Sequence, residues 1–409
     1  MSEFLTLLPP TEALQKLLDH LPVRVRSETI ETVQALGRVT ASPIVAPHSL
    51  PSFPRSTVDG YAVRAADTHG ASESLPAYLR LCGEVPMGAT PTSDTAPGQT
   101  MLIHTGGMLP ASADAVVMLE HTQGVREDEI EILRAVAAGE NAIAVGEDVR
   151  EGEEVIPPGT RLRPAEIGGL IALGLTRLDV ACAPRVGILS TGDEVVPPEA
   201  LLRPGQVRDV NSYALSALVE QAGGSSIRYG ILPDRAELLR PAAERALAEC
   251  DLIVITAGSS ASTRDLTAQV VDMLGKPGVL VHGVDVRPGK PTILAVCQGK
   301  AAVGLPGNPV SALVIAGLFV VPVVERLLGL RRDRPRGMVT ANLTINVASQ
   351  AGREDWIPVS LLPGPDGYQA EPLFGKSNLI FTLSRADGLV RVPPDATGLH
   401  AGDRVMVTL

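Results

Sequence analysis

Cysteine is scarce in this 409-residue sequence, and no two cysteines lie close together. A structural zinc site usually needs a CxxC pair, and the chain has none, which argues against zinc. We expect isolated core thiols in a reducing compartment. The four cysteines are Cys82, Cys182, Cys250 and Cys297.

The chain also lacks an excess of positive charge. Its 35 Lys and Arg residues against 46 Asp and Glu residues give a formal net charge of −11. A general nucleic-acid-binding surface is therefore not expected. If the ligand is an anion, the cations that bind it must be concentrated locally.

Long apolar runs are absent as well. The longest, residues 310–324, falls short of the roughly 20 residues that a membrane helix needs. Residues 1–10 show neither the basic region nor the apolar stretch of a signal peptide. We therefore expect a cytoplasmic protein.

Several common catalytic motifs are missing from the sequence. It contains no Walker loop, no GxGxxG fingerprint and no HExxH, and no Ser-His-Asp or Cys-His grouping stands out. Ordinary P-loop and Rossmann nucleotide binding are therefore weakly supported. Hydrolysis by acyl transfer is not supported either.

The residues that are present predict a multidomain α/β and β protein. From residue 185 onward, buried apolar runs alternate with helical patterns, which predicts a doubly wound α/β domain. The pattern of residues 78–145 predicts short strands with regular turns. Residues 338–409 show no helical period, which favours strands there as well. We predict an α/β domain (1–22 and 177–330), a mixed linker domain (23–47 and 146–176), an inserted β domain (48–145) and a C-terminal β-barrel (336–409), for which a small sandwich is the alternative.

Three loops of the α/β domain follow directly after strands. They are STGDE (190–194), TAGSSASTRD (256–265) and LPGNP (305–309). The carboxyl ends of parallel strands meet at one edge of a sheet, and loops rich in small donors at helix starts suit phosphate. The alternative for Asn308 is a simple helix cap. The phosphate-binding candidates are Ser190, Thr191, Gly192, Gly258, Ser259, Ser260, Pro306, Gly307 and Asn308.

Acidic residues accompany these loops. Carboxylates beside a phosphate would repel it unless a cation intervened, and Mg²⁺ bridges carboxylate and phosphate oxygens. The alternative is that Asp234 and Asp265 merely cap helices. We predict that the metal ligands are Asp193, Glu194 and Asp234.

A basic turn, VRPGKP (286–291), lies between two of these loops. Arg287 offers forked donors and Lys290 a point charge, a pairing that suits a tetrahedral oxyanion. A basic turn considered alone would more often be solvated surface. A second loop, residues 51–67, is rich in hydrogen-bonding groups and predicts either a well-satisfied turn or a ligand site.

Many of these stretches together resemble one family. STVDGYAVRAAD, STGDEVVPP, VRPGKP, GLPGNPVSALV, GREDWIPVSL and GKSNLIFTLSRADGLVRVP occur here in order. They are similar to motifs of the molybdopterin molybdotransferases, the molybdenum-insertion enzymes related to the E domain of gephyrin. The resemblance spans nearly the whole chain.

The resemblance implies a function in molybdenum cofactor biosynthesis. A homodimeric transferase would convert adenylylated molybdopterin and molybdate into molybdenum cofactor and AMP, assisted by magnesium. The α/β domain would bind molybdopterin, and the adenylyltransferase of the same pathway is a candidate partner. RDLTAQVV (264–271) looks like the adenylyltransferase version of the domain. The alternatives are therefore a molybdopterin adenylyltransferase or a non-catalytic pterin-binding paralogue.

The resemblance also implies roles for individual residues. Asp59 and Thr105 match positions that reach toward the partner subunit's cleft. Glu194, Asp234 and Asp265 match acids around the pterin phosphate and the metal. The implied oxyanion pocket comprises Arg287, Lys290, Pro291, Arg353 and Ser377, and the implied catalytic set is Asp59, Thr105, Glu194, Asp234, Asp265 and Lys290.

Overall fold

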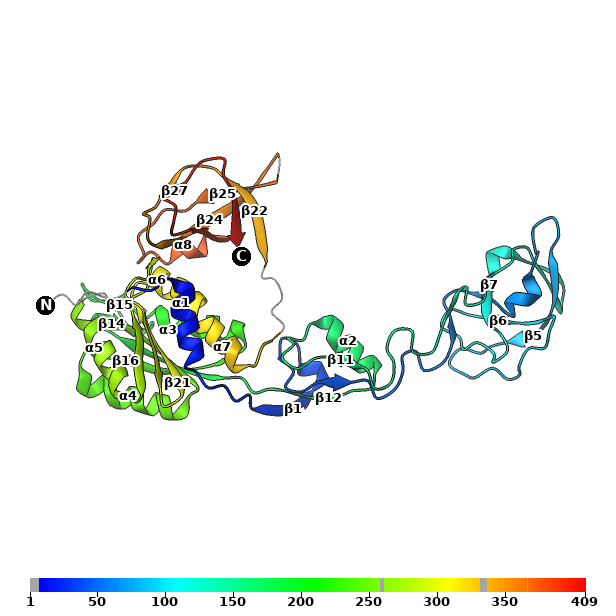
Figure 1. Ribbon diagram of the computed structural model, residues 1–409, viewed down its shortest axis with the longest axis horizontal. Coiled ribbons are helices and arrows are strands. Elements are labelled where there is room, and N and C mark those ends of the chain that lie inside the picture. The colour runs from blue at the N-terminus through cyan, green and yellow to red at the C-terminus, as the bar shows by residue number, and fades with distance from the viewer. Residues whose placement is uncertain (1–6, 258–260, 332–336, 366) are drawn as a thin grey trace.

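The computed structural model describes residues 7–257, 261–331, 337–365 and 367–409. The molecule is elongated: the α/β domain and the C-terminal barrel lie at one end, and the inserted β domain lies at the other (Figure 1). A narrow linker domain joins the two ends.

The α/β domain is built on a six-stranded sheet. Four strands run parallel, and the two last strands in the sheet order run antiparallel to their neighbours. The apolar stretch of residues 186–189 is completely buried in the second strand, as a central parallel strand requires. The sheet order is β16 (Ser225–Leu232), β13 (Arg185–Thr191), β17 (Leu252–Ala257), β21 (Lys300–Pro306), β20 (Ile293–Cys297) and β18 (Pro277–His282).

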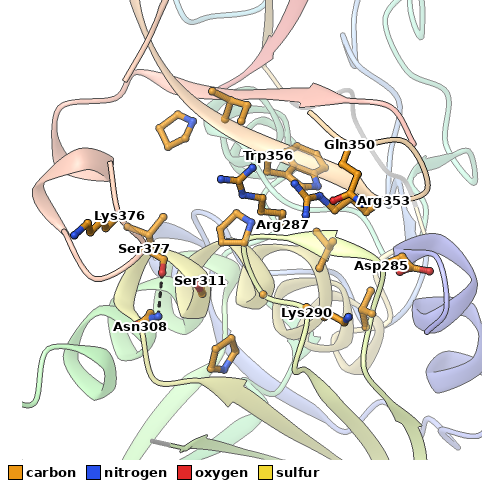
Figure 2. A pocket seen from close by; sticks show the side chains of 18 of the residues that line it. Asp285, Arg287, Lys290, Asn308, Ser311, Gln350, Arg353, Trp356, Lys376 and Ser377 are labelled. Atoms are coloured by element: carbon orange, nitrogen blue, oxygen red, sulfur yellow. Dashed lines mark hydrogen bonds between the residues drawn. The ribbon is translucent and has the colours of Figure 1, made fainter. Parts of the chain in front are cut away.

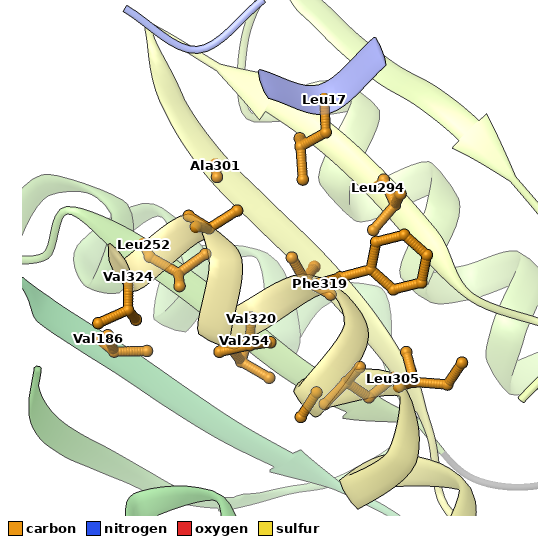
Figure 3. Packing of buried hydrophobic residues seen from close by; sticks show 14 of the residues in the cluster. Leu17, Val186, Leu252, Val254, Leu294, Ala301, Leu305, Phe319, Val320 and Val324 are labelled. Atoms are coloured by element: carbon orange, nitrogen blue, oxygen red, sulfur yellow. The ribbon is translucent and has the colours of Figure 1, made fainter. Parts of the chain in front are cut away.

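Helices cover both faces of this sheet and bury separate apolar clusters. One face carries α1 (Pro10–Asp19), α3 (Asn211–Ala222), α6 (Pro309–Ile315), a π-helical segment (Ala316–Val320) and α7 (Val321–Leu327). The other face carries α4 (Ala236–Glu249) and α5 (Ala261–Met273). Phe319 is fully buried in the first cluster, among side chains from the sheet (Figure 3).

The helix Pro309–Leu327 is long and apolar enough to cross a membrane by length and composition. In the structure it packs onto the sheet, with 61% of its most apolar window buried. Its π-helical segment ends directly before α7, where Pro322 occupies the first turn.

The linker domain is formed by two separate parts of the chain. Strand β1 (Ser27–Glu31) pairs with β12 (Arg177–Ala181), and β2 (Ile44–Val45) pairs with β11 (Glu154–Ile156). Helix α2 (Pro164–Ala172) packs on them. Because β12 pairs with β1, residues 177–181 lie with the linker strands, although our predicted α/β segment began at 177.

The inserted β domain contains a second six-stranded sheet. Its order is β7 (Ala115–Met118), β4 (Gly60–Val63), β6 (Gln99–Ile103), β5 (Ala77–Glu84), β9 (Glu129–Ile132) and β8 (Thr122–Arg126). A short pair, β3 (Arg55–Ser56) with β10 (Ala142–Ile143), lies beside it.

The C-terminal domain is a closed barrel of β24 (Glu354–Gly364), β25 (Gly367–Pro372), β22 (Met338–Leu343), β28 (Arg404–Thr408) and β26 (Gly388–Val392). Strand β26 closes the barrel by pairing with β24. The α/β domain adds β19 (Val286–Arg287), which pairs in parallel with β24 and aligns Arg287 with Asp355. This junction brings the basic turn and the barrel together.

Candidate functional site

A cavity of about 830 Å³ lies between the α/β domain and the barrel. Its walls are the basic turn, the start of α6, the start of β24 and the loop before helix α8 (Phe381–Ser384) (Figure 2). Among the described residues, four cationic side chains line it. They are Arg287, Lys290, Arg353 and Lys376.

Hydrogen bonds hold the backbone of the basic turn in place. Thr292 Oγ1 donates to the Gly289 carbonyl at 2.6 Å, and the Val284 N–H donates to the Lys290 carbonyl at 2.9 Å. Gly289 is buried and has a φ of +117°, a conformation that strongly favours glycine. The turn therefore presents Arg287 and Lys290 to the cavity from a fixed backbone.

The cavity has a positive charge that matches a dianion. Asp285 also lines it, and the buried Asp355 contacts two of its arginines. Four cations and two carboxylates leave two positive charges at neutral pH. Forked guanidinium donors and an ammonium group are well suited to tetrahedral oxyanions.

Asn308 connects the α/β domain to the barrel. Its Nδ2 donates to Ser377 Oγ at 2.9 Å, and the Val310 N–H donates to the Ser377 carbonyl at 3.0 Å. The Asn308 side chain makes no helix-capping hydrogen bond, so the simple cap interpretation is wrong for this residue. Both predicted site residues thus lie at the domain junction.

A second cavity, of about 570 Å³, lies on the other side of Asn308. Ser190 and Thr191 at the end of β13, Glu194 just after it, Thr256 at the end of β17 and Gly307 line it, so residues of all three predicted loops meet here. Asn211 Nδ2 donates to the Gly307 carbonyl at 2.7 Å and fixes that loop. Small hydroxyls and backbone groups around this space suit a phosphate.

The predicted metal ligands gather beside this second cavity. The Asp234 N–H points to Asp193 Oδ1 at 3.4 Å. Asp234 Oδ1 is buried and has no hydrogen-bond partner in the described part of the chain, and its carboxylate does not cap α4. Burial raises the pKa of Asp234, and the negative charges of Asp193 and Glu194 raise it further. An orphaned carboxylate oxygen near two other acids fits a cation.

These acids do not form a complete metal site on their own. In the described ranges, no three His, Cys, Asp or Glu side chains are arranged to hold a metal ion. Mg²⁺ is usually held by one or two carboxylates together with substrate phosphates and water. The residues present therefore fit a magnesium ion that arrives with a phosphorylated substrate.

Asp59 and Thr105 lie in the inserted β domain, at the far end of the molecule from both cavities (Figure 1). Asp59 Oδ1 accepts the Thr105 N–H at 2.7 Å and the Thr105 hydroxyl at 3.1 Å. Both hydrogen bonds lower the pKa of Asp59, and the one from the Thr105 backbone has the larger effect. Within one chain, this pair does not meet the other candidate residues.

Part of the predicted site lies outside the described residues. Gly258, Ser259 and Ser260 are not described, and the Asp265 side chain is not described although its backbone lies in α5. The remaining predicted residues, Gly192 at the end of β13 and Pro291 and Pro306 on the first cavity, are placed by the structure.

Sequence reasoning missed several lining residues. Ser311 and Trp356 face the first cavity, each three positions after a residue that was predicted, and Lys376 directly precedes Ser377. Asp209 lines the second cavity and accepts the Ser190 hydroxyl at 2.9 Å. For Ser311, Trp356 and Lys376, the close spacing from predicted residues was the available signal, whereas Asp209 lies 19 positions after Ser190.

Comparison with known proteins covers almost the full chain. Residues 8–174 match the MoeA N-terminal region (domain I and II), residues 187–326 a probable molybdopterin binding domain, and residues 340–409 the MoeA C-terminal region (domain IV).

Curated relatives and solved structures agree with these matches. A molybdopterin molybdenumtransferase from a Nostoc species is 33% identical, over 96% of this chain and 90% of that protein. A molybdopterin molybdenumtransferase from Bacillus subtilis is 30% identical, over 100% of this chain and 95% of that protein. The crystal structure of a molybdopterin biosynthesis MoeA protein from Pyrococcus horikoshii has a TM-score of 0.86 at 33% identity, covering 99% of this chain and 100% of that chain. The chain therefore belongs to the MoeA family and is an enzyme of the transferase class to which these curated relatives belong.

Proposed function

We propose that this enzyme inserts molybdenum into molybdopterin, converting adenylylated molybdopterin and molybdate into molybdenum cofactor and AMP. The observation that carries the proposal is the pair of cavities on either side of Asn308. One has a surplus of two positive charges, which suits the molybdate dianion. The other is lined by small hydroxyls and acids, which suits a phosphate with its metal ion.

The side chains of the first cavity bind and orient molybdate. Arg287 and Arg353 donate forked hydrogen bonds to its oxygens, and Lys290 contributes a compact charge. Because the turn backbone is hydrogen-bonded in place and Arg353 pairs with the buried Asp355, little reorganisation is needed to stabilise the negative charge. The cavity therefore holds molybdate next to the phosphate subsite.

The second cavity holds the phosphate end of the pterin substrate. The Ser190 and Thr191 hydroxyls and the Gly307 turn supply donors and backbone groups, while one or two of the acids Asp193, Glu194 and Asp234 would hold Mg²⁺ together with the substrate phosphates. When bound, Mg²⁺ supplies charge neutralisation at the phosphoanhydride. Asn308, which borders both cavities, aligns the two subsites.

We further propose that the enzyme acts as a cytoplasmic homodimer, with Asp59 and Thr105 of each chain completing the cleft of its partner. These two residues are exposed at the far end of an elongated chain, which supports a role in another subunit. The adenylyltransferase of the same pathway would supply the adenylylated substrate and is a proposed partner. Light scattering at micromolar concentration should give twice the chain mass, and a monomer would contradict the dimer.

The function is tested in a reconstituted assay with adenylylated molybdopterin, molybdate and Mg²⁺. Wild-type enzyme should release AMP and form cofactor only when molybdate is present. Lys290→Ala should abolish most of this turnover, whereas Lys16→Ala, an exposed lysine on α1, should not affect it. ATP consumption with molybdopterin in the absence of molybdate would instead establish an adenylyltransferase. No turnover in either assay would indicate a pterin-binding paralogue.

A further inference from the structure

We propose that Asp355 is a positioning residue for the oxyanion: its buried carboxylate fixes Arg353 and Arg287 in an arrangement that fits a tetrahedral dianion. The inference rests on the proposed function and deepens it, because it identifies what orients the molybdate-binding cations. Asp355 itself does not line the cavity, so it acts through the two arginines.

The contacts of Asp355 are those of a carboxylate that holds a guanidinium group in place. Asp355 is fully buried. Arg353 Nε donates to its Oδ1 at 2.9 Å, and Arg353 Nη2 lies 3.5 Å from Oδ2. This pairing uses the Nε–Nη2 edge of the planar guanidinium and leaves the Nη1 edge for a ligand. The orientation of Arg353 toward the cavity is thereby set.

The second arginine comes from the other domain. Arg287 Nη1 lies 3.6 Å from Asp355 Oδ2. The register of β19 on β24 places these two residues opposite each other, and the Glu354 N–H donates to the Asp285 carbonyl at 3.0 Å. One carboxylate therefore joins two cations that belong to different domains.

The neighbouring residue provides a matched control. Glu354 is 5% exposed, on the same strand and similarly buried, but its side chain leaves the strand on the opposite face. It pairs with Arg391 of β26 at 2.6 Å and accepts the Trp356 Nε1–H at 2.8 Å. Glu354→Gln removes the charge that pairs with Arg391 but keeps an amide oxygen that can accept from Trp356 on the cavity wall, so it should perturb the barrel without touching the arginines of the cavity.

If Asp355 acted only through its charge, Asp355→Asn would change the affinity for molybdate in one direction, and if it positions Arg353, the change would be in the opposite direction. Removing a negative charge beside the cavity would strengthen binding of a dianion if charge alone mattered. Loss of a charge-assisted pair that orients Arg353 should instead weaken molybdate binding about tenfold or more. A purely structural role would lower the melting temperature and leave the affinity of the folded fraction unchanged.

The test is isothermal titration of sodium molybdate into wild-type enzyme, Asp355→Asn and Glu354→Gln, with thermal unfolding recorded in parallel. We expect weaker binding in Asp355→Asn and wild-type affinity in Glu354→Gln. Arg353→Lys, which keeps the charge but loses the forked geometry, should also weaken binding about tenfold, and this variant decides the matter if Asp355→Asn does not fold.

Unchanged or tighter molybdate binding in Asp355→Asn would overturn the inference, as would wild-type affinity in Arg353→Lys. Absence of molybdate binding by the wild-type enzyme would overturn the inference and the proposed oxyanion cavity together. If the expected binding pattern holds but the reconstituted assay shows no turnover, the proposed function fails and the positioning role of Asp355 stands.

Discussion

Gly289→Ala should damage both the stability of the α/β domain and the basic turn on which the proposed anion site depends. A Cβ built on Gly289 would lie 2.2 Å from Ile315 Cγ1 and 2.4 Å from Ile315 Cδ1. Ile315 is fully buried in α6, so its side chain has no open space to move into. The backbone at Gly289 also has a φ of +117°, which alanine adopts only with strain.

The two effects can be estimated separately. A left-handed backbone costs alanine about 1–2 kcal/mol. Overpacking a close-packed core costs about 1–3 kcal/mol more. Gly289→Ala should therefore lower the free energy of unfolding by about 2–5 kcal/mol, measured by chemical denaturation with far-UV circular dichroism.

Gly230→Ala is the matched control. Gly230 lies in β16 of the same domain with a φ of +88°, and nothing lies within 4 Å of the Cβ that would be added. Gly230→Ala should lower the free energy of unfolding only by the cost of the strained backbone, about 1–2 kcal/mol. Combining Gly289→Ala with Ile315→Ala should cost less than the sum of the two single changes, because the second removes the clashing atoms.

Equal destabilisation by Gly289→Ala and Gly230→Ala would refute the packing argument. Additivity of Gly289→Ala with Ile315→Ala would refute it as well. The functional consequence is checked independently. Because Gly289 lies between Arg287 and Lys290, its alanine variant should bind molybdate more weakly, whereas Gly230→Ala should bind it normally.

Three other outcomes follow from burial and titration. Asp234 has a raised pKa, so its contribution to stability is present below 3.8 and is lost as the pH rises through the raised value; Asp234→Asn should raise the melting temperature at neutral pH, with a difference that shrinks as the pH falls towards 3.8. Phe319→Ala, at a fully buried position, should cost about 3–5 kcal/mol, whereas Phe374→Ala, at a side chain 65% exposed, should stay within about 0.5 kcal/mol in denaturant titrations. Asp59 has a lowered pKa, so its contribution is present above 3.8 and is lost as the pH falls through the lowered value; carboxyl NMR should show titration below 3.8, moving upward in Thr105→Val.

Local patterns in the sequence predict the elements and the loops well. The run at residues 186–189 is a buried strand, and the Pro-Gly turn at 288–289 presents its two cations to a cavity. These features depend on burial, turn chemistry and strand ends, which are encoded over a few residues. The sequence pattern could therefore specify them without long-range information.

Contacts between domains were beyond the reach of local patterns. Nothing in the stretch around Val286 indicates that it joins the sheet of the barrel, because its partner β24 begins far along the chain at Glu354. The pairing of Asn308 with Ser377, rather than with its own helix, has the same origin. Both contacts require the complete fold, and both decide the shape of the site.

The domain junction also explains why the cations of this site come from two domains. Like charges facing one cavity repel each other, and Asp355 offsets only part of that repulsion between Arg287 and Arg353. Within one rigid element, this cost would fall entirely on folding. Here the repulsion between Arg287 and Arg353 weakens the contact between two domains, at the junction of β19 with β24. A bound dianion that attracts both arginines offsets this repulsion. Anion binding should therefore strengthen the contact between the barrel and the α/β domain, since a ligand stabilises whatever arrangement it binds.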